Sequence, residues 1–236
     1  VVDGVLNNNE TVSAVVDSES RKSTARNHTA THILHKALKE VLGDHVKQSG
    51  SLVAPDRLRF DFTHFAGVSR DDIYEIEDKV NQAVLENYQV STEKMALDDA
   101  LEKGVVALFG EKYDESVRVV SVGDVSSELC GGTHVERSGE IGMFKILSES
   151  SISAGVRRIE ASTGINSFVK ATHWENLLID LSDKLKTNPE NLEDRVQKLQ
   201  TQLKDLNKQI STIQAEMARN EIEDKLNNPS KVCGYN

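Results

Sequence analysis

The amino-acid sequence predicts an α+β protein: a two-layer domain of helices and a mixed or antiparallel sheet over residues 1–166, followed by a long helical coiled-coil module over residues 167–236. Two observations predict the first part. Helical and strand patterns are intermixed without a regular strand–helix–strand rhythm, and no glycine-rich phosphate loop is present. A third observation predicts the coiled-coil module: the pattern after Gly164 is helical almost throughout.

The first elements alternate between the two patterns. Residues 1–17 alternate loosely between apolar and polar side chains and contain turn signals, which predicts strands. Residues 23–42 show a helical apolar face, and Gly43 is expected to end that helix. Residues 58–62 alternate like a half-buried strand. Residues 69–85 begin with a capping-box pattern and continue with helical spacing, so they predict a second long helix.

Shorter elements follow. Residues 97–103 predict a short helix, and the β-branched run 117–122 predicts a strand. Ser126 and Ser127 are expected to form a turn. Residues 141–147 and 156–161 predict two further strands that complete the sheet.

The last part of the chain predicts two helices. Residues 167–186 form the first, and Asn188 with Pro189 supplies an N-cap and a first-turn proline for the second. Apolar residues then recur at alternating spacings of four and three, which is typical of a coiled-coil seam on a helix about 50 Å long. The seam would pair with a second copy, giving a homodimer, or with residues 167–186. It contains Leu192, Val196, Leu199, Leu203, Leu206, Ile210, Ile213 and Met217.

Composition excludes several classes of protein. No apolar stretch approaches the roughly 20 residues needed to span a membrane. Only two cysteines are present, which excludes a disulfide scaffold and favours a reducing, cytoplasmic location. The net charge of −10 is concentrated in residues 71–115, which hold 13 acidic and 4 basic side chains. Because the acidity is local, the charge neither supports nor excludes an RNA partner.

Two pairs of residues have the spacing of metal ligands. His28 and His32 lie one turn apart on the same face of the predicted helix, so both imidazoles can reach one ion. Cys130 and His134 flank two glycines and a threonine in a loop after a strand, and the glycines allow that loop to fold tightly. Three nitrogens and one sulfur suit tetrahedral Zn²⁺. His35 is expected to be a surface or capping histidine, unless it pairs with His32 at another site.

The remaining histidines and the known catalytic motifs predict no further functional site. His45, His64 and His173 have no partners in the sequence and are expected to have ordinary roles. The residue after His28 is Thr rather than Glu, so the histidine pair lacks the general base of zinc proteases. No nucleophile elbow or Walker loop is present.

The motifs resemble the editing domain of alanyl-tRNA synthetases over nearly the whole chain. The two ligand pairs alone are shared with the editing domain of threonyl-tRNA synthetases and with free-standing relatives. The Cys-Gly-Gly-Thr-His form and the trailing heptads are similar to the alanyl type. The similar segments are Asn27-His28-Thr29-Ala30-Thr31-His32, Gln48-Ser49-Gly50-Ser51-Leu52-Val53, Leu58-Arg59-Phe60-Asp61-Phe62, Cys130-Gly131-Gly132-Thr133-His134 and Gly155-Val156-Arg157-Arg158-Ile159-Glu160-Ala161.

The resemblance implies that the chain is a piece of an ATP-dependent alanine–tRNA ligase. It implies that the synthetic active site and the tRNA-reading domains precede Val1, that a small barrel is truncated at the start, and that a C-terminal domain is absent. The implied function is post-transfer editing: hydrolysis of the ester that joins serine or glycine to the terminal adenosine of tRNA(Ala), with Zn²⁺ as cofactor.

The resemblance also assigns roles to residues. Cys130 is expected to be a catalytic residue as well as a zinc ligand, and the N–H groups of Gly131 and Gly132 are expected to stabilise an oxyanion. Gln48 and Ser49 are expected to recognise the hydroxyl of serine, which would reject alanine.

Arginines are the residues expected to contact the acceptor end of the tRNA through phosphate. They are Arg157 and Arg158, of which one is expected to act because neighbours on a strand face opposite ways, and Arg59, with Arg57 a weaker candidate. Phe60 and Phe62 are expected to be core residues.

Two other interpretations of the same residues stay open. One is an editing enzyme of the threonyl or free-standing type, against which the coiled coil argues. The other is not an enzyme: zinc would hold together a tRNA-docking or oligomerisation module, since four protein ligands are typical of a structural site. The sequence does not decide whether zinc is catalytic, positions the substrate or is structural.

Overall fold

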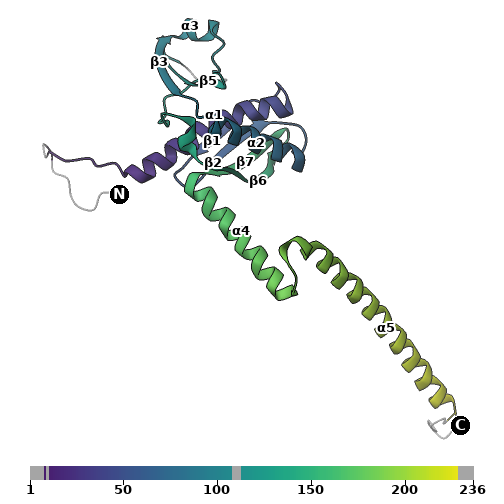
Figure 1. Ribbon diagram of the computed structural model, residues 1–236. Coiled ribbons are helices and arrows are strands. Elements are labelled where there is room, and N and C mark those ends of the chain that lie inside the picture. Colours follow the sequence, from purple (N-terminus) through teal and green to yellow (C-terminus); the bar gives the residue numbers. More distant parts are fainter. Residues whose placement is uncertain (1–7, 9–10, 108–112, 228–236) are drawn as a thin grey trace. The chain divides into compact units, whose positions relative to one another are not determined.

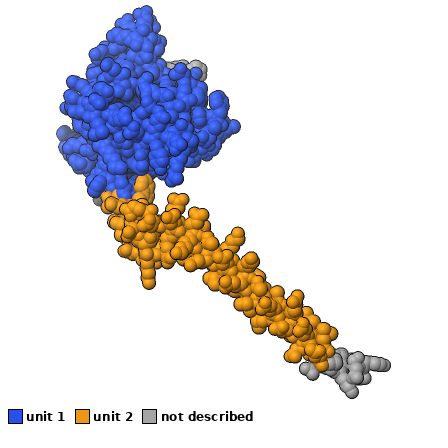
Figure 2. Space-filling view, turned by 45° about the vertical axis from the view of Figure 1, so that its right-hand side comes forward, with its two compact units in different colours: residues 1–171 blue, residues 172–236 orange. Residues whose placement is uncertain are grey.

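A computed structural model of the chain describes residue 8, residues 11–107 and residues 113–227. The chain divides into two compact units, residues 1–171 and residues 172–236, which Figure 2 shows in different colours. Every residue predicted to form the metal site or to contact RNA lies in unit 1.

The main part of unit 1 has two layers, a four-stranded sheet and two helices (Figure 1). The strands are antiparallel in the order β1-β2-β7-β6. Leu58, Phe60 and Phe62, at alternate positions of β2, are fully buried in one core with Ile33 and Leu34 of α1. The α+β prediction is therefore confirmed. The elements are α1 (Ser18–Leu42), β1 (Gln48–Val53), β2 (Leu58–Thr63), α2 (Arg70–Leu85), β6 (Phe144–Ser153) and β7 (Val156–Thr163).

A second, three-stranded sheet completes unit 1. Its antiparallel order is β3-β4-β5, and it has a small apolar core that includes Ala100, Val117 and Leu129. The last strand ends at Leu129, so it delivers the chain directly to Cys130. Its elements are β3 (Val90–Ala96), α3 (Leu97–Glu102), β4 (Ser116–Val122) and β5 (Ser126–Leu129), and the short 3₁₀ helix η1 (Ser138–Ile141) precedes β6.

The start and end of α1 follow local chemistry. The helix begins at Ser18, five residues before the predicted start, because the Asp17 side chain accepts a hydrogen bond from the Ser20 N–H at 2.6 Å. It ends at Gly43, as predicted, where φ is 111°. The predicted strands over residues 1–17 are wrong for residues 11–17, which form no regular element and are exposed. Residues 1–7 and 9–10 lie outside the described residues.

The structure also differs from several of the strand predictions. Ser126 and Ser127 belong to β5 rather than to a turn. The strand predicted from residue 141 begins at Phe144, because residues 138–141 form η1. Strand β2 is more than half buried, since Asp61 on its polar face is also covered. Strand β3 was not predicted, because its seven residues are mostly exposed and show no clear alternation.

The C-terminal helices match the prediction. Helix α4 (Gly164–Leu185) crosses from unit 1 into unit 2, where η2 (Pro189–Asn191) leads into α5 (Leu192–Asn227). Asn188 is the N-cap of η2 and Pro189 its first residue. On α5, seam residues from Leu203 to Met217 are 52–66% exposed. Homodimerisation through this seam stays a prediction. None of the described helices is long and apolar enough to cross a membrane.

Candidate metal centre

The first two candidate ligands lie on α1, where the helix is buried and held in place. His28 and His32 are one turn apart, next to the fully buried Asn27. The Asn27 amide donates to the Ala54 carbonyl at 2.7 Å and accepts from the Thr163 hydroxyl at 2.7 Å. Because these bonds connect α1 to a β-turn and to β7, they fix the rotation of the helix and therefore the direction of both histidines.

The other two candidate ligands lie on the loop that follows β5, and Arg118 of β4 fixes this loop. The Cys130 N–H donates to the Arg118 carbonyl at 3.0 Å. In return, the Arg118 guanidinium donates to the carbonyls of Cys130 and Gly132 at 2.8 and 2.7 Å. The side chains of Cys130 and His134 are thereby directed toward α1.

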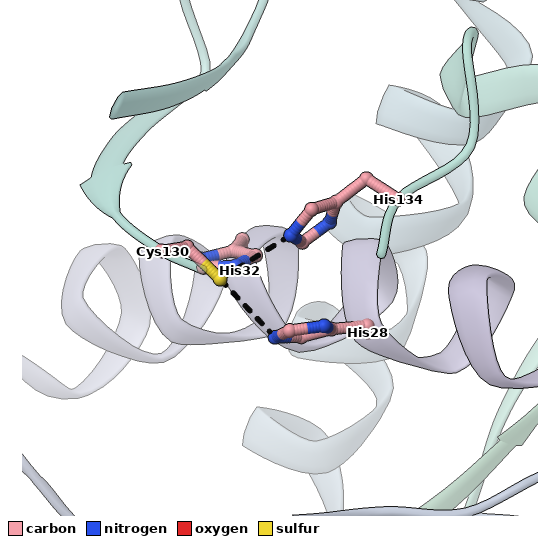
Figure 3. A group of neighbouring side chains, drawn as sticks. All are labelled: His28, His32, Cys130 and His134. Atoms are coloured by element: carbon pink, nitrogen blue, oxygen red, sulfur yellow. Dashed lines mark hydrogen bonds between the residues drawn. The ribbon is translucent and has the colours of Figure 1, made fainter. Parts of the chain in front are cut away.

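The four side chains converge on one point (Figure 3), and one potential ligand atom from each lies within 4.8 Å of the others. The Cys130 sulfur is 3.4 Å from Nε2 of His28 and 3.3 Å from Nε2 of His134. Zinc bonds of about 2.3 Å to sulfur and about 2.0–2.1 Å to nitrogen, at tetrahedral angles, place sulfur and nitrogen roughly 3.5 Å apart. His28, His32, Cys130 and His134 therefore have the donor set and the spacing of a zinc site.

Other residues orient the ligands. Glu128 is buried and accepts from Nδ1 of His32 at 2.7 Å and from Nδ1 of His35 at 3.1 Å. The Thr29 hydroxyl lies 3.1 Å from Nδ1 of His134. With Nδ1 occupied in both ligands, Nε2 is left to bind a metal. Nε2 of His32 is buried and makes no hydrogen bond in the described residues, as a metal-binding nitrogen would.

The electrostatics of the cluster favour a thiolate. Burial raises the pKa of the Cys130 thiol, but the neighbouring imidazoles of His134, His28 and His32 and the Gly132 N–H outweigh it and lower the pKa to about 3. Burial lowers the pKa of His32, but the Cys130 sulfur and the Glu128 carboxylate raise it to about 9. Without metal the cluster thus holds a thiolate beside an imidazolium, and zinc would displace the His32 proton.

The low pKa gives a prediction for the reactivity of Cys130. In the metal-free chain with Cys233→Ser, the alkylation rate of Cys130 by iodoacetamide should stay flat from about pH 5 to about pH 8, because the thiolate is already formed. An ordinary thiol with a pKa of about 8.5 reacts roughly tenfold more slowly for each pH unit below that value. Mass spectrometry at several pH values measures the rate, and added Zn²⁺ should suppress it. A rate that rises tenfold per pH unit would contradict the thiolate.

A second prediction concerns Glu128. Glu128→Gln keeps the shape of the side chain but removes the charge that holds two imidazoles, so the affinity for Zn²⁺ should fall by about 10–100-fold. Competition with a chelating dye measures the affinity. Glu160→Gln is the matched control, because Glu160 is also a strand residue of unit 1 but is paired with Arg57. Equal affinities for parent and Glu128→Gln would show that the carboxylate does not support the ligands.

The structure places the residues predicted for catalysis differently. The Gly132 N–H donates to the Cys130 sulfur at 3.4 Å, whereas the N–H of the exposed Gly131 makes no hydrogen bond in the described residues. Gln48 begins β1, and its amide lies 3.4 Å from the Ser51 hydroxyl. Ser49 is exposed, and no hydrogen bond of the described residues joins either side chain to the metal cluster.

All of the predicted RNA-binding arginines have carboxylate neighbours. Arg158 makes two bonds to Asp61, at 2.6 and 2.8 Å, and Arg59 lies 3.7 Å from the same carboxylate. Arg157 makes two bonds to Glu149. Arg57 contacts Asp56 and Glu160. Phosphate would therefore compete with a carboxylate at each arginine, and RNA binding by them stays a prediction.

Several residues of the site were missed or misjudged from the sequence. His35 is not a surface residue: it is 3% exposed and shares Glu128 with His32. Its position on the same helical stripe as the ligands was the available signal. Glu128 and Arg118 gave no signal, because Glu128 meets its histidines only where β5 packs against α1, and Arg118 meets the ligand loop only through the pairing of β4 with β5. His45 and His64 are also partners, with Nε2 of His45 2.9 Å from Nδ1 of His64.

Comparison with known proteins gives the family. Residues 117–160 match the second additional domain of threonyl and alanyl tRNA synthetases. The whole chain is 49% identical to a part of the alanine–tRNA ligase of Alkaliphilus oremlandii, and it covers 27% of that protein. Over 211 residues, 89% of the chain, it is 52% identical to the alanine–tRNA ligase of a Thermotoga strain and covers 24% of it. A third such ligase, from Desulforamulus reducens, is 48% identical over 97% of the chain, which covers 26% of it.

The chain thus spans about a quarter of the length of these relatives. None of the matches supports the ATP site that the resemblance implied for the whole ligase, since the matched domain is described only as an additional domain. The match to the Alkaliphilus ligase runs along the whole chain and therefore includes the positions of the four candidate ligands, whereas the domain match includes those of Cys130 and His134. By homology along its whole length, this chain belongs to the alanine–tRNA ligase family.

Proposed function

We propose that His28, His32, Cys130 and His134 bind Zn²⁺, and that unit 1 hydrolyses the ester between serine or glycine and the terminal adenosine of mischarged tRNA(Ala). The convergence of four ligand atoms within 4.8 Å supports the metal, and homology with alanine–tRNA ligases supports the RNA substrate. The relatives named above are all alanine–tRNA ligases, which favours the alanyl over the threonyl type.

Different groups of the site would have different roles in the hydrolysis of the ester. Zinc, when bound, supplies a Lewis acid that polarises or anchors an oxygen of the substrate. The exposed N–H of Gly131 is free to donate to the developing oxyanion, whereas the Gly132 N–H is engaged by the Cys130 sulfur. We therefore assign the oxyanion contact to Gly131 and a positioning role to Gly132.

Selection of serine over alanine requires a polar group that the hydroxyl can reach. Gln48 and Ser49 are the proposed groups. Among the described residues the Gln48 side chain makes a single hydrogen bond, to Ser51, which is long at 3.4 Å, so its amide can turn to a substrate at little cost. When the substrate lacks the hydroxyl, these groups are left unpaired, which is a strong basis for rejection.

One observation favours the non-enzymatic alternative. All four tetrahedral positions would be filled by protein, which is typical of structural zinc. In that case zinc would stabilise the fold of a tRNA-docking module and unit 1 would bind RNA without hydrolysing it.

The deciding experiment compares tRNA(Ala) charged with serine, glycine or alanine. We expect this chain to release serine and glycine faster than alanine by at least about tenfold, the change that corresponds to about 1.4 kcal/mol of transition-state binding. The zinc content of the same sample is measured in parallel. A folded, zinc-loaded chain that releases none of the three amino acids above the spontaneous rate would contradict the hydrolase and favour the structural role.

A further inference from the structure

We propose that the aromatic rings of Phe65, His45 and His64 form a stacking platform for one unpaired nucleobase of the bound RNA. These three rings together are called the platform. The proposal rests on the RNA substrate proposed above, and it adds a contact site that is separate from the metal centre.

The platform is a ladder of rings that leads from the core to solvent. Phe62 is fully buried and lies 6.4 Å from His64, measured between ring centroids. The rings of His64 and His45 lie edge to edge and nearly parallel, with centroids 5.2 Å apart, an interplanar angle of 23° and ring nitrogens 2.9 Å apart. The His45 ring in turn stacks with Phe65, at 5.5 Å and an angle of 21°. The last ring, Phe65, is 86% exposed. The ladder therefore ends in a large apolar ring surface that faces water.

Hydrogen bonds hold the rings of the platform in place. Nε2 of His45 and Nδ1 of His64 are 2.9 Å apart, so the two imidazoles are tied to each other. The Thr63 hydroxyl donates to the His45 carbonyl at 2.7 Å, and the His64 N–H donates to the Gly155 carbonyl at 3.0 Å. A platform that is already ordered loses little conformational entropy when a ligand stacks on it.

The location of the platform links it to the metal centre. The His45 ring lies against Gly43, where a Cβ would be 3.1 Å from Nδ1 of His45. Gly43 ends α1, the helix that carries His28 and His32. Eleven residues separate His32 from Gly43, which is about 17 Å along the helix. If the terminal ribose is bound at the metal centre, a short run of unpaired nucleotides can therefore span the distance from it to the platform.

The chemistry of the platform favours a base over other ligands. Proteins bind unpaired bases by stacking them on Phe, Tyr, Trp or His rings, and such stacking accepts any base. Burial, His45 and the charge of Arg157 lower the pKa of His64, so this ring is neutral at neutral pH and can share a hydrogen bond with His45. Arg157, predicted from the sequence to meet phosphate, is thus close to the platform.

The test measures the affinity of this chain for a fluorescent RNA hairpin with a short unpaired 3′ end, and for the same hairpin with a blunt end. Phe65→Ala should weaken binding of the first hairpin by about 5- to 150-fold, the range found for base–aromatic stacking, and leave the blunt hairpin unchanged. Phe65→Trp should restore the affinity, whereas Phe65→Leu, which keeps the apolar character, should not. Tyr74→Ala removes an aromatic ring that is 54% exposed on α2 and is the matched control.

The outcomes separate this proposal from the proposed function. Equal affinity of the parent and Phe65→Ala for the hairpin with the unpaired end would overturn the platform, as would the lack of measurable binding by the parent. Failure of the hydrolase would appear instead as a parent chain that binds the RNA, with the Phe65 dependence intact, but releases no amino acid. Zinc content should be the same in every variant, because no ring contact or side-chain hydrogen bond of the described residues joins the platform to the four ligands.

Discussion

Replacing Cys130 by Ala is expected to lower the affinity for Zn²⁺ by roughly 10²–10³-fold and to abolish ester hydrolysis. Structural zinc sites bind with about 10–16 kcal/mol, so each of four ligands accounts for about 2.5–4 kcal/mol. Cys130 also supplies the only negative charge among the four ligands, and its sulfur contacts Nε2 of both His28 and His134. Its loss leaves three imidazoles that repel each other when protonated.

The measurement combines zinc titration with release of serine from charged tRNA(Ala). Cys233→Ser is the control cysteine variant; that residue lies outside the described part of the chain. Circular dichroism of Cys130→Ala in the presence and absence of zinc shows whether the chain is folded. A folded variant that keeps the zinc affinity of the parent would show that the thiolate is not a ligand. Normal hydrolysis by a zinc-free variant would separate the reaction from the metal.

The ligand set could be predicted from the sequence because each pair is local. His28 and His32 are related by one helical turn, and a helical pattern alone puts them on the same face. Cys130 and His134 are related by a short loop whose glycines signal a tight fold. Because zinc binds a set of nitrogen and sulfur ligands, the two pairs could be assigned to one ion, although they are about a hundred residues apart in the chain. Their convergence in the structure is what this reasoning requires.

The supporting residues could not be predicted because their contacts are long-range. Glu128 lies 96 residues from His32 and 93 from His35, and only the packing of β5 against α1 joins them. The same holds for Asp61, which is buried on the polar face of β2 because Arg158 of β7 covers it. Periodicity describes one element at a time, so it underestimates burial wherever a charged partner comes from a distant strand.

The local sequence pattern also gave a wrong strand prediction in a segment whose apolar residues are exposed. Val12 and Val16 alternate as in a strand, but they are 57% and 61% exposed and precede the helix cap at Asp17. The alternation in this segment has no sheet to pair with in the described residues. An apolar pattern predicts an element only when a partner surface is present to bury it.

Gly132→Ala is expected to lower the affinity for Zn²⁺ by roughly 10²–10³-fold, as the loss of a ligand would. A Cβ at position 132 would overlap Cε1 and Nδ1 of the His28 ring and lie 3.3 Å from its Nε2. The Arg118 guanidinium binds the carbonyls on both sides of the loop, so the backbone has little freedom to move away. The imidazole must therefore rotate out of the cluster.

The neighbouring glycine provides the control, since a Cβ at Gly131 would have no atom within 4 Å. Gly131→Ala should therefore bind zinc like the parent, and any loss of hydrolysis in it would report on substrate rather than metal. The double variant Gly132→Ala with His28→Ala tests the steric cause. Removing the imidazole creates room for the new methyl group, so the double variant should bind zinc no more weakly than His28→Ala alone. Additive losses would show that Gly132 acts through the backbone of the loop and not through His28.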